Sequence, residues 1–562
     1  MSIAATVARG ADRPADTIHG RVAAVARAHP DAIALRSGDC RLSYRELVRQ
    51  AQAFSHRLVG LGVGPGDIVP LLLPRGIDIV VAALGILGSG AAYAALDLSW
   101  PADRLAQLVD SVDPPVVVVA DDHAAGQHVA FQQAGLTGRR TVRVGGPAAE
   151  QVDDRVGEQV DQPATEHVGE PATERVGEPA TERELLSWAQ GDPTAVSTVF
   201  FTSGSTGLPK AVLSTHQATT RLFGPDGVLL AGPGTAMPCL APLPWDGFSL
   251  ELWGMLTTGG TSVLYHGDFF MPADLIELVS RQGVDQLWLT AGLFNVFVTE
   301  QVEAFTGLRR VLTGGERMSA PHARRFLQAH PTIELVNGYG PVETCVFAST
   351  HRVQLAELAG QDELPVGAPV ADTSVRILDG DRQLCIGEIG EICIGGGGLA
   401  RGYHGRAELT ERSFPVLAGL PEPTRGFPSD TGTAEGQRLY RTGDLGLIDD
   451  AGLLHYRGRL DRQLKVAGHR VEPGEVEAVA VGCGAAQAVV LGIPAPTGIS
   501  GLALFAVAGS PELDVARLRS ALRTELPGYL MPRRIELVDR IPLTNNGKVD
   551  HQALSERLLA AR

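Results

Sequence analysis

Residues 200–210, FFTSGSTGLPK, form a segment rich in glycine and hydroxyl side chains that ends on a lysine. Glycine lets a backbone approach an anion closely, hydroxyl groups donate hydrogen bonds to it, and lysine adds positive charge. The composition predicts a phosphate-binding loop, and the open alternative is a flexible Ser/Gly turn between two strands. The candidate phosphate ligands are Thr202, Ser203, Gly204, Ser205, Thr206, Gly207 and Lys210.

This segment differs from the two commonest nucleotide-binding motifs. Pro209 separates its glycines from Lys210, and Ala-Val-Leu follows where a P-loop has Ser or Thr at the start of a helix. The glycine run at 395–398 continues with Ala400 and Arg401, so it does not complete G-x-G-x-x-G. A P-loop kinase and a dinucleotide-binding domain are therefore disfavoured.

The overall composition limits the classes of partner. A net charge of −16 without a Lys/Arg cluster argues against a nucleic-acid surface. The six cysteines include no C-x-x-C pair, which indicates neither a zinc ribbon nor a disulfide framework. The sequence contains neither a signal-peptide pattern nor a run of about 18 apolar residues. We therefore expect a cytoplasmic protein with reduced thiols and no nucleic-acid or membrane partner.

The arrangement of elements that must position the loop predicts an α/β protein. Through the first 350 residues, β-branched stretches alternate with helical periodicity, as in βαβ units. A Pro- and Glu-rich period of eight (PATEHVGE, PATERVGE) within 147–190 cannot bury a face, and we expect a disordered acidic insertion there. Short alternating strands at about 365–460 indicate an antiparallel or barrel-like unit, and a small α+β unit follows.

These patterns predict two domains. The N-terminal domain, residues 1–460, contains two βαβ-type subdomains and the small barrel-like subdomain. The C-terminal domain, residues 461–562, is the smaller α+β unit, and we place the boundary at Asp461.

Eight motifs in register resemble the adenylate-forming enzymes, and among them the amino-acid-activating adenylation domains of nonribosomal peptide synthesis. They span nearly the whole chain, from LSYREL (42–47) and LGSGAAYAALD (87–97) through NGYGPVET (337–344) and YRTGDL (440–445) to LTNNGKVD (543–550). The resemblance implies an enzyme that joins an amino acid to the α-phosphate of ATP with Mg²⁺, releases pyrophosphate, and passes the acyl group to a thiol.

The resemblance also implies roles for individual residues. Lys548 would bridge the substrate carboxylate and the α-phosphate, and Glu343 would hold Mg²⁺. Tyr339 would stack on adenine, and Asp444 would accept hydrogen bonds from the ribose hydroxyls. Besides the loop at 202–210, the implied ATP and AMP ligands are Gly315, Glu316, Gly338, Tyr339, Gly340, Thr344, Asp444 and Arg459. The implied catalytic residues are Lys548, Lys465 and Thr206.

Two further positions suggest that the C-terminal domain moves between the half-reactions. Asp461 resembles the family's hinge residue. Lys465 would face the active site during thiol transfer, while Lys548 would leave it.

The implied substrate pocket points to an aliphatic amino acid. Asp246, in LPWDGFSLELW, matches the aspartate that pairs with the α-ammonium of the substrate. The remaining implied lining has no side chain with a polar group except the closing lysine, so a polar substrate side chain would lack a partner. That lining is Gly247, Leu250, Leu293, Leu312, Gly314, Gly338, Val346, Phe347 and Lys548. We expect valine, isoleucine, leucine or 2-aminobutyrate.

The placement of Leu293 rests on WLTAGLFNVF, which lacks the proline-rich signal that usually fixes the register.

Only fourteen residues follow Lys548, so we expect a free-standing enzyme that loads a separate phosphopantetheinylated carrier protein. A small helper protein is a further possible partner. Two alternatives stay open: an acyl- or aryl-CoA ligase of the same fold, and a non-catalytic nucleotide-binding protein.

Overall fold

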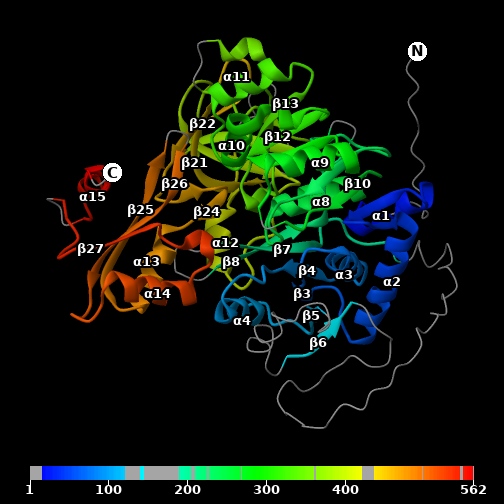
Figure 1. Cartoon of the computed structure of the whole chain (residues 1–562), viewed down its shortest axis with the longest axis horizontal. Helices are drawn as coiled ribbons and strands as arrows, with labels where there is room; N and C mark the ends of the chain where they lie inside the picture. The colour runs from blue at the N-terminus through cyan, green and yellow to red at the C-terminus, as the bar shows by residue number, and fades with distance from the viewer. Residues whose placement is uncertain are drawn as a thin grey trace, which may run out of the picture.

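The computed structural model describes residues 16–120, 139–144, 188, 190–203, 209–224, 227–267, 269–359, 363–420, 436–495, 498–544 and 548–560. The acidic repeat expected within 147–190 lies outside these ranges except for positions 188 and 190, and so do residues 204–208. No helix in the described ranges is long and apolar enough to cross a membrane. A smaller C-terminal unit, orange to red in Figure 1, lies at one side of the larger N-terminal unit.

Two mainly parallel sheets form the first half of the larger unit, as the alternating pattern predicted. The first has the order β6-β5-β3-β4-β7-β8, with antiparallel pairing only between β7 and β8, and the second has the order β2-β1-β10-β9. The first sheet consists of β3 (Ile68–Leu72), β4 (Ala92–Ala95), β5 (Val117–Val119), β6 (Thr141–Arg143), β7 (Val196–Thr202) and β8 (Lys210–Thr215). The second consists of β1 (Ile33–Ser37), β2 (Cys40–Ser43), β9 (Ala236–Cys239) and β10 (Thr261–Leu264).

A third sheet, β11-β12-β13-β14-β15, positions much of the candidate site. Its strands are β11 (Gln286–Thr290), β12 (Arg310–Gly314), β13 (Glu334–Tyr339), β14 (Ser349–Arg352) and β15 (Ala368–Pro369). The first three are parallel, and their register sets Thr290 beside Gly314 and Gly314 beside Gly338. Binding sites of α/β sheets lie at such carboxyl ends of parallel strands.

Helices cover these sheets, and a local sequence signal marks the start of some of them. Ser43 caps the second helix in a reciprocal capping box with Glu46. The helices of the larger unit are α1 (Ile18–Ala28), α2 (Tyr44–Gly60), α3 (Ile77–Gly88), α4 (Ala102–Asp110), α7 (His216–Thr220), α8 (Asp246–Leu256), α9 (Pro272–Gln282), α10 (Ala291–Gln301), α11 (Ala320–Ala329) and α12 (Ala407–Ser413), with 3₁₀ turns η1 (Val302–Phe305), η2 (Val342–Thr344) and η3 (Leu355–Leu358).

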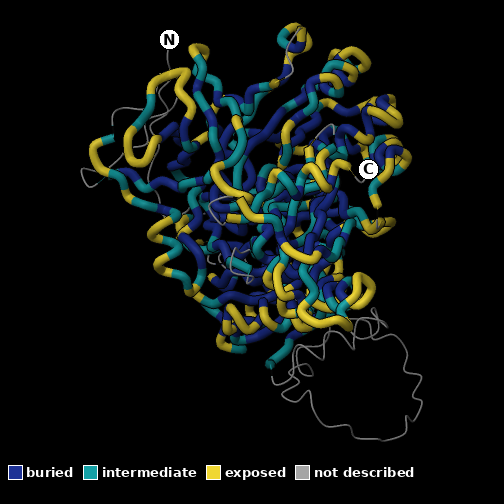
Figure 2. Tube along the Cα trace, turned by 90° about the vertical axis from the view of Figure 1, so that its left-hand side faces the viewer, coloured by how far each residue is buried: buried dark blue, intermediate teal, exposed yellow. Residues whose placement is uncertain are grey.

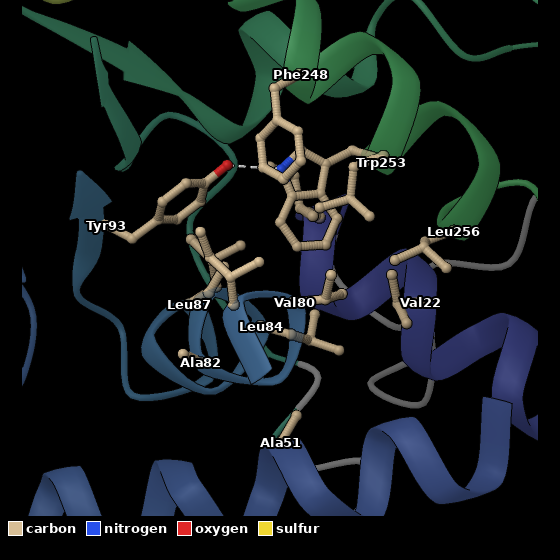
Figure 3. Packing of buried hydrophobic residues seen from close by; sticks show 14 of the residues in the cluster. Val22, Ala51, Val80, Ala82, Leu84, Leu87, Tyr93, Phe248, Trp253 and Leu256 are labelled. Carbon is tan, nitrogen blue, oxygen red and sulfur yellow. Dashed lines mark hydrogen bonds between the residues drawn. The ribbon is translucent and has the colours of Figure 1, made fainter. Parts of the chain in front are cut away.

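The largest hydrophobic core lies between α3, α8 and the first two sheets. Figure 3 shows α3 side chains such as Val80 and Leu84 facing the rings of Phe248 and Trp253 from α8. The Trp253 indole N–H donates a 2.8 Å hydrogen bond to the Tyr93 hydroxyl, which satisfies both buried polar groups. Buried positions concentrate inside the molecule, and exposed positions lie mostly on its outer turns and loops (Figure 2).

The antiparallel unit expected at about 365–460 is present as the sheet β17-β16-β18-β21-β22. Its strands are β16 (Thr373–Asp379), β17 (Arg382–Gln383), β18 (Gly390–Gly396), β21 (Tyr440–Ile448) and β22 (Leu454–Arg459), beside the pair β19 (Val416–Leu417) and β20 (Gln437–Arg438). The long ladder from β21 to β22 pairs Asp444 with Arg459.

The C-terminal unit has its own core and is an α+β domain, as predicted. It begins with the hairpin β23 (Leu464–Val466) and β24 (His469–Val471). The other elements are β25 (Ala485–Ala495), β26 (Gly498–Ala508), β27 (Arg534–Leu537), α13 (Pro473–Gly482), α14 (Val515–Glu525), η4 (Gly528–Leu530) and α15 (His551–Ala560). Asp461 lies in the short link between β22 and β23. The α/β class with a large N-terminal and a small C-terminal domain is thereby confirmed.

Candidate active site

Three of the predicted nucleotide ligands meet at the end of β13. The hydroxyl of Tyr339 donates a hydrogen bond of 2.7 Å to Asp444 Oδ2, and Arg459 pairs with Asp444 Oδ1 from the neighbouring strand. Burial, and then the charge of Asp444, hold the pKa of Tyr339 well above its ordinary value, so the hydroxyl stays a donor. The cluster sets a fixed carboxylate at a cavity wall, where it can accept hydrogen bonds from sugar hydroxyls.

A cavity of about 320 Å³ adjoins this cluster. Of the predicted nucleotide ligands, its wall contains Gly315, Glu316, Gly338, Tyr339, Gly340 and Arg459. Its volume is in the range of small-molecule sites. Tyr339 gives this wall an aromatic ring, so the arrangement can hold a flat heterocycle next to an aromatic side chain.

Lys465 reaches this site from the C-terminal unit. Its ammonium lies 5.8 Å from the Tyr339 ring centroid and 5.7 Å from that of Tyr456. Desolvation lowers the pKa of Lys465, and the nearby Asp444 carboxylate opposes that shift. A half-buried cation thus borders both the nucleotide-sized cavity and the smaller cavity that contains Asp246.

Glu343 is fully buried on η2 and has two partners. The Tyr403 hydroxyl donates to Oε1 at 2.9 Å, and Arg470 of the C-terminal unit donates to Oε2 at 2.7 Å. Burial alone would raise the pKa of Glu343, but Arg470 and the hydrogen bonds together lower it. The carboxylate is therefore ionised and balanced by a cation. A lone carboxylate completed by phosphate oxygens is a donor set that suits Mg²⁺, so the residues fit that ion. The adjacent Thr344 is buried, and its hydroxyl donates to the Pro341 carbonyl at 3.1 Å.

The ends of the phosphate-loop segment lie next to Glu343, while Gly204, Ser205, Thr206 and Gly207 lie outside the described residues. Thr202 and Lys210 face each other across the β7–β8 ladder. The Ser203 hydroxyl donates to the Arg470 carbonyl at 2.8 Å, and the Lys210 ammonium lies 3.8 Å from Glu472. Both contacts reach the C-terminal unit.

Asp246 begins α8 and lines a cavity of about 100 Å³. Its Oδ2 accepts a 2.8 Å hydrogen bond from the backbone N–H of Val346. Val346 and its neighbour Cys345 hold φ values of +60° and +55°, a left-handed conformation that is costly for a β-branched residue. Desolvation raises the pKa of Asp246 to about 6, which the backbone hydrogen bonds partly oppose. A cationic group of a ligand would restore the ordinary ionisation of this carboxylate.

Apolar rings close the same cavity. Its walls include Trp288, Val346 and Phe347. A Cβ added at Gly338 would lie 2.2 Å from the Phe347 ring, and one added at Gly247 would lie 3.2 Å from the Trp288 ring. These glycines therefore make room for the two rings.

The remaining predicted lining residues stand behind this wall or away from it. Leu250 and Leu312 are fully buried in the core that also contains Trp288 and Phe347, and Gly314 lies against Gly338. Leu293 does not line the cavity, because it packs against the separate core around α10. Trp288 lines the cavity instead, from β11, the strand that directly precedes the helix of Leu293. Its signal in the sequence was its position two residues before the end of a strand that faces the site.

Lys548 lies apart from this cluster. It is exposed, in a turn where its backbone N–H donates to the Thr544 hydroxyl at 3.3 Å, and it borders none of the described cavities. Asp461 accepts hydrogen bonds of 2.6 and 2.8 Å from Arg459. The domains are therefore posed with Lys465 inside the site and Lys548 outside it.

Further contacts across the domain interface hold this pose. Arg104 of α4 forms a buried ion pair of 2.8 Å with Glu475 of α13. The Gly468 N–H donates to Glu316 at 2.9 Å. The His469 ring packs edge-on against Trp245 and stacks on Tyr529. His469 and Arg470 lie in GRLDRQLKVAGHRVE (458–472), one of the eight motifs in register. Their partners lie on other segments, so the sequence did not show these pairs.

Comparisons with known proteins agree with this architecture. The AMP-binding enzyme family matches residues 22–404, and the AMP-binding enzyme C-terminal domain matches residues 475–548. The structure of a holo NRPS protein containing adenylation and PCP domains, bound to a vinylsulfonamide inhibitor, has 29% sequence identity and a TM-score of 0.77. The match covers 96% of this chain and 84% of the chain in that structure.

Similar curated proteins are much longer than this chain. Malpibaldin synthetase of Mortierella alpina is 33% identical over 94% of this chain, which spans 9% of that protein. Tyrocidine synthase 3 of Brevibacillus parabrevis is 32% identical over 92% of this chain, which spans 7% of that protein. The family match covers most of the chain and both units of the fold. The chain belongs to the AMP-binding enzyme family.

Proposed function

We propose that this chain activates a small or branched aliphatic amino acid with ATP and transfers it to the phosphopantetheine thiol of a separate carrier protein. Valine, isoleucine, leucine and 2-aminobutyrate are the candidate substrates. The observation that carries the proposal is Asp246, a carboxylate in a small cavity whose nearest walls include the Trp288 and Phe347 rings.

Asp246 supports an amino acid rather than a plain carboxylic acid. Desolvation by burial raises its pKa to about 6, and the backbone hydrogen bonds only partly oppose that shift. An α-ammonium would supply a compensating cation and donate a charge-assisted hydrogen bond. A fatty or aryl acid would leave the carboxylate unpaired, which is costly in a desolvated site.

The cavity volume of about 100 Å³ supports a short side chain. The charged lining residues Asp444, Arg459, Lys465 and Arg470 belong to the nucleotide site and the domain interface. The part of the wall formed by Trp288 and Phe347 carries no charge, so a polar substituent between these two rings would lose hydrogen bonds to water. Discrimination between two amino acids whose side chains differ by one methylene is worth about 1–3 kcal/mol, so several aliphatic amino acids compete for the site.

In the first half-reaction, a carboxylate oxygen of the amino acid attacks the α-phosphorus of ATP, and the bond to pyrophosphate breaks. Lys548, brought in by rotation at Asp461, neutralises the charge between carboxylate and phosphate. Glu343 would hold Mg²⁺, which supplies charge neutralisation at the phosphates. Tyr339, Asp444 and Arg459 orient the nucleoside.

In the second half-reaction, the carrier sulfur attacks the acyl carbon. A C–S bond forms, the C–O bond to AMP breaks, and the thiol proton passes to solvent. The pose with Lys465 inside the site and Lys548 exposed supports assignment of this arrangement to thiol transfer.

Amino-acid-dependent ATP/pyrophosphate exchange across the proteinogenic set plus 2-aminobutyrate tests the proposal. We expect exchange with branched aliphatic amino acids and its loss in Asp246→Asn. The matched control is Asp97→Asn, which changes a carboxylate outside this cavity. Exchange with fatty or aryl acids alone would instead indicate an acyl-CoA ligase, and no exchange with any acid would indicate a nucleotide-binding protein.

A further inference from the structure

Arg221 is a buried arginine of the larger unit whose guanidinium hydrogen-bonds only to neutral groups. It directly follows α7 and is 7% exposed. Its Nε donates to the Thr373 hydroxyl at 3.2 Å, and Nη1 donates to the Ala218 carbonyl at 2.5 Å. Within the described ranges, no carboxylate forms an ion pair with this guanidinium. Burial of a cation without an ion pair is costly, so its hydrogen bonds must offset that cost.

The remaining hydrogen bonds of Arg221 go to the turn at 344–347. Nη2 donates to the carbonyls of Thr344 and Phe347 at 2.8 and 2.7 Å, and Nη1 donates to the Cys345 carbonyl at 3.5 Å. Cys345 and Val346 are the two residues of this turn with left-handed φ values. Such a conformation persists only where its surroundings enforce it. The guanidinium therefore holds a turn that its own sequence disfavours.

The turn carries two groups of the amino-acid cavity. The Val346 N–H donates to Asp246, and the Phe347 ring forms part of the wall. The 3₁₀ turn η2, at the start of this segment, has hydrogen bonds of its own, from Thr344 to the Pro341 carbonyl at 2.9 and 3.1 Å. A displacement of the turn would therefore disturb the amino-acid cavity more than η2, which carries the carboxylate that fits Mg²⁺.

The glycine run at 395–398 gives Arg221 its space. A Cβ added at Gly398 would lie 2.4 Å from Nη2 of Arg221, and one added at Gly397 would lie 2.0 Å from the Asp372 carboxylate. Gly398 does not have a positive φ, so the space and not the backbone conformation requires glycine there. The run, which completes no dinucleotide-binding motif, thus allows this cation to pack against the turn.

We propose that Arg221 is a positioning residue of the amino-acid site, whose guanidinium holds the 344–347 turn in the shape that the site needs. That shape directs the Val346 N–H at Asp246 and sets the Phe347 ring in the wall. Arg221 itself does not line the cavity. A lysine would keep the charge but replace the planar fork with one ammonium, so it cannot reach the same set of carbonyls. The inference rests on the proposed function and adds to it a residue behind the cavity wall.

Arg221→Lys tests this role in amino-acid-dependent ATP/pyrophosphate exchange. We expect the KM for the preferred amino acid to rise about tenfold or more, because the turn loses buried hydrogen bonds, while kcat and the KM for ATP change less than about threefold. Arg21→Lys is the matched control, since its guanidinium also binds two backbone carbonyls, those of Thr220 and Phe223, but none in the turn. An equal rise of KM in the control would assign the effect to packing around α7 and overturn the proposal.

The pH dependence of that KM is a readout that a general loss of stability would not move. By donating to the carboxylate, the Val346 N–H lowers the pKa of Asp246. Loss of this hydrogen bond in Arg221→Lys should raise that pKa, so the rise of KM on acidification should begin at a higher pH than in the wild type. The substitution changes none of the other charged groups that face Asp246, which are Glu343, Asp444, Arg459, Lys465 and Arg470. An unmoved transition would contradict the proposal.

Gly398→Ala reaches the same guanidinium without replacing it and serves if Arg221→Lys does not fold. The added methyl group should displace Nη2 and produce both changes, the higher KM and the shifted transition. Gly64→Ala is its control, because a Cβ at Gly64 meets no atom within 4 Å. A folded Gly398→Ala variant with the KM and the pH transition of the wild type would count against the proposal.

A measurement without substrate separates failure of this inference from failure of the proposed function. The gain in thermal midpoint from Asp246→Asn at pH 8 should be larger in the Arg221→Lys background than in the wild type, because the carboxylate has lost a hydrogen bond there. The Arg21→Lys background should show the wild-type gain. Absence of amino-acid-dependent exchange in the wild type would refute the proposed function, and the thermal readout would still decide the role of Arg221. Equal gains in all three backgrounds would overturn the inference.

Discussion

Arg470 and Glu343 form an ion pair of 2.7 Å between the two domains, in which the carboxylate is fully buried. The carboxylate is the one that fits Mg²⁺, and the guanidinium arrives on the same hairpin as Lys465. In the proposed two-step cycle, Mg²⁺ and the Arg470 guanidinium would therefore replace each other beside Glu343 as the domains change pose. The pair also explains why the buried carboxylate stays ionised in this arrangement.

Loss of Arg470 should affect thiol transfer selectively. Breaking a buried pair costs on the order of 3 kcal/mol, which corresponds to about a hundredfold in the population of the pose. We expect Arg470→Ala to slow thioester formation by about that factor and to alter ATP/pyrophosphate exchange by less than tenfold. Arg462→Ala is the control, since Arg462 contacts Glu477 within the C-terminal unit. Equal losses in the rates of ATP/pyrophosphate exchange and thioester formation would contradict the replacement of Mg²⁺ by Arg470 beside Glu343.

The two lysines should separate the half-reactions. Lys548→Ala is expected to abolish exchange, because no other cation would then bridge the carboxylate and the α-phosphate. Lys465→Ala should preserve exchange and slow acyl transfer from preformed aminoacyl-AMP. Single-turnover measurements with each variant check both expectations. Similar damage to exchange by both substitutions would rule out two poses.

Asp246 should impose a pH dependence on substrate binding. Its pKa of about 6 in the free enzyme means that the carboxylate protonates as pH falls through 6, which removes the charge that holds the ammonium. The KM for the amino acid should therefore rise below pH 6. Asp246→Asn should bind weakly at every pH and lack this transition.

The same shift predicts a stability effect. A carboxyl whose folded pKa exceeds its unfolded value of about 3.9 makes the folded state less stable as pH rises between the two values. Asp246→Asn should raise the thermal midpoint of the ligand-free protein at pH 8, and the gain should vanish near pH 4. Calorimetric scans at both pH values measure it, and a destabilised variant at pH 8 would show that the carboxylate is compensated.

Trp288 should limit the size of the side chain. Trp288→Leu enlarges the cavity beside Gly247 and is expected to shift relative kcat/KM about tenfold toward leucine over valine, the scale of one methylene. Leu293→Ala should leave the preference unchanged, because Leu293 packs in another core. A preference that follows Leu293 and not Trp288 would reverse this assignment.

Sequence patterns foresaw much of this arrangement because motif residues lie at the ends of strands. Tyr339 ends β13, and Asp444 and Arg459 pair across adjacent strands, so their meeting follows from the sheet register. The positions of Trp288 and Leu293 depend on which face of a strand or helix meets the site, which lacked a local signal. The Arg470 pair depends on the relative pose of two domains, and no local pattern encodes that.

The most direct test of the central claim compares valine with 3-methylbutanoic acid, its analogue without the amino group, in ATP/pyrophosphate exchange by the wild-type enzyme. An unpaired Asp246 should reject the analogue, so we predict exchange with valine and a kcat/KM at least about a hundredfold lower with the acid. Equal exchange with both compounds would contradict the assignment of Asp246 as the amino-group ligand and the amino-acid substrate with it.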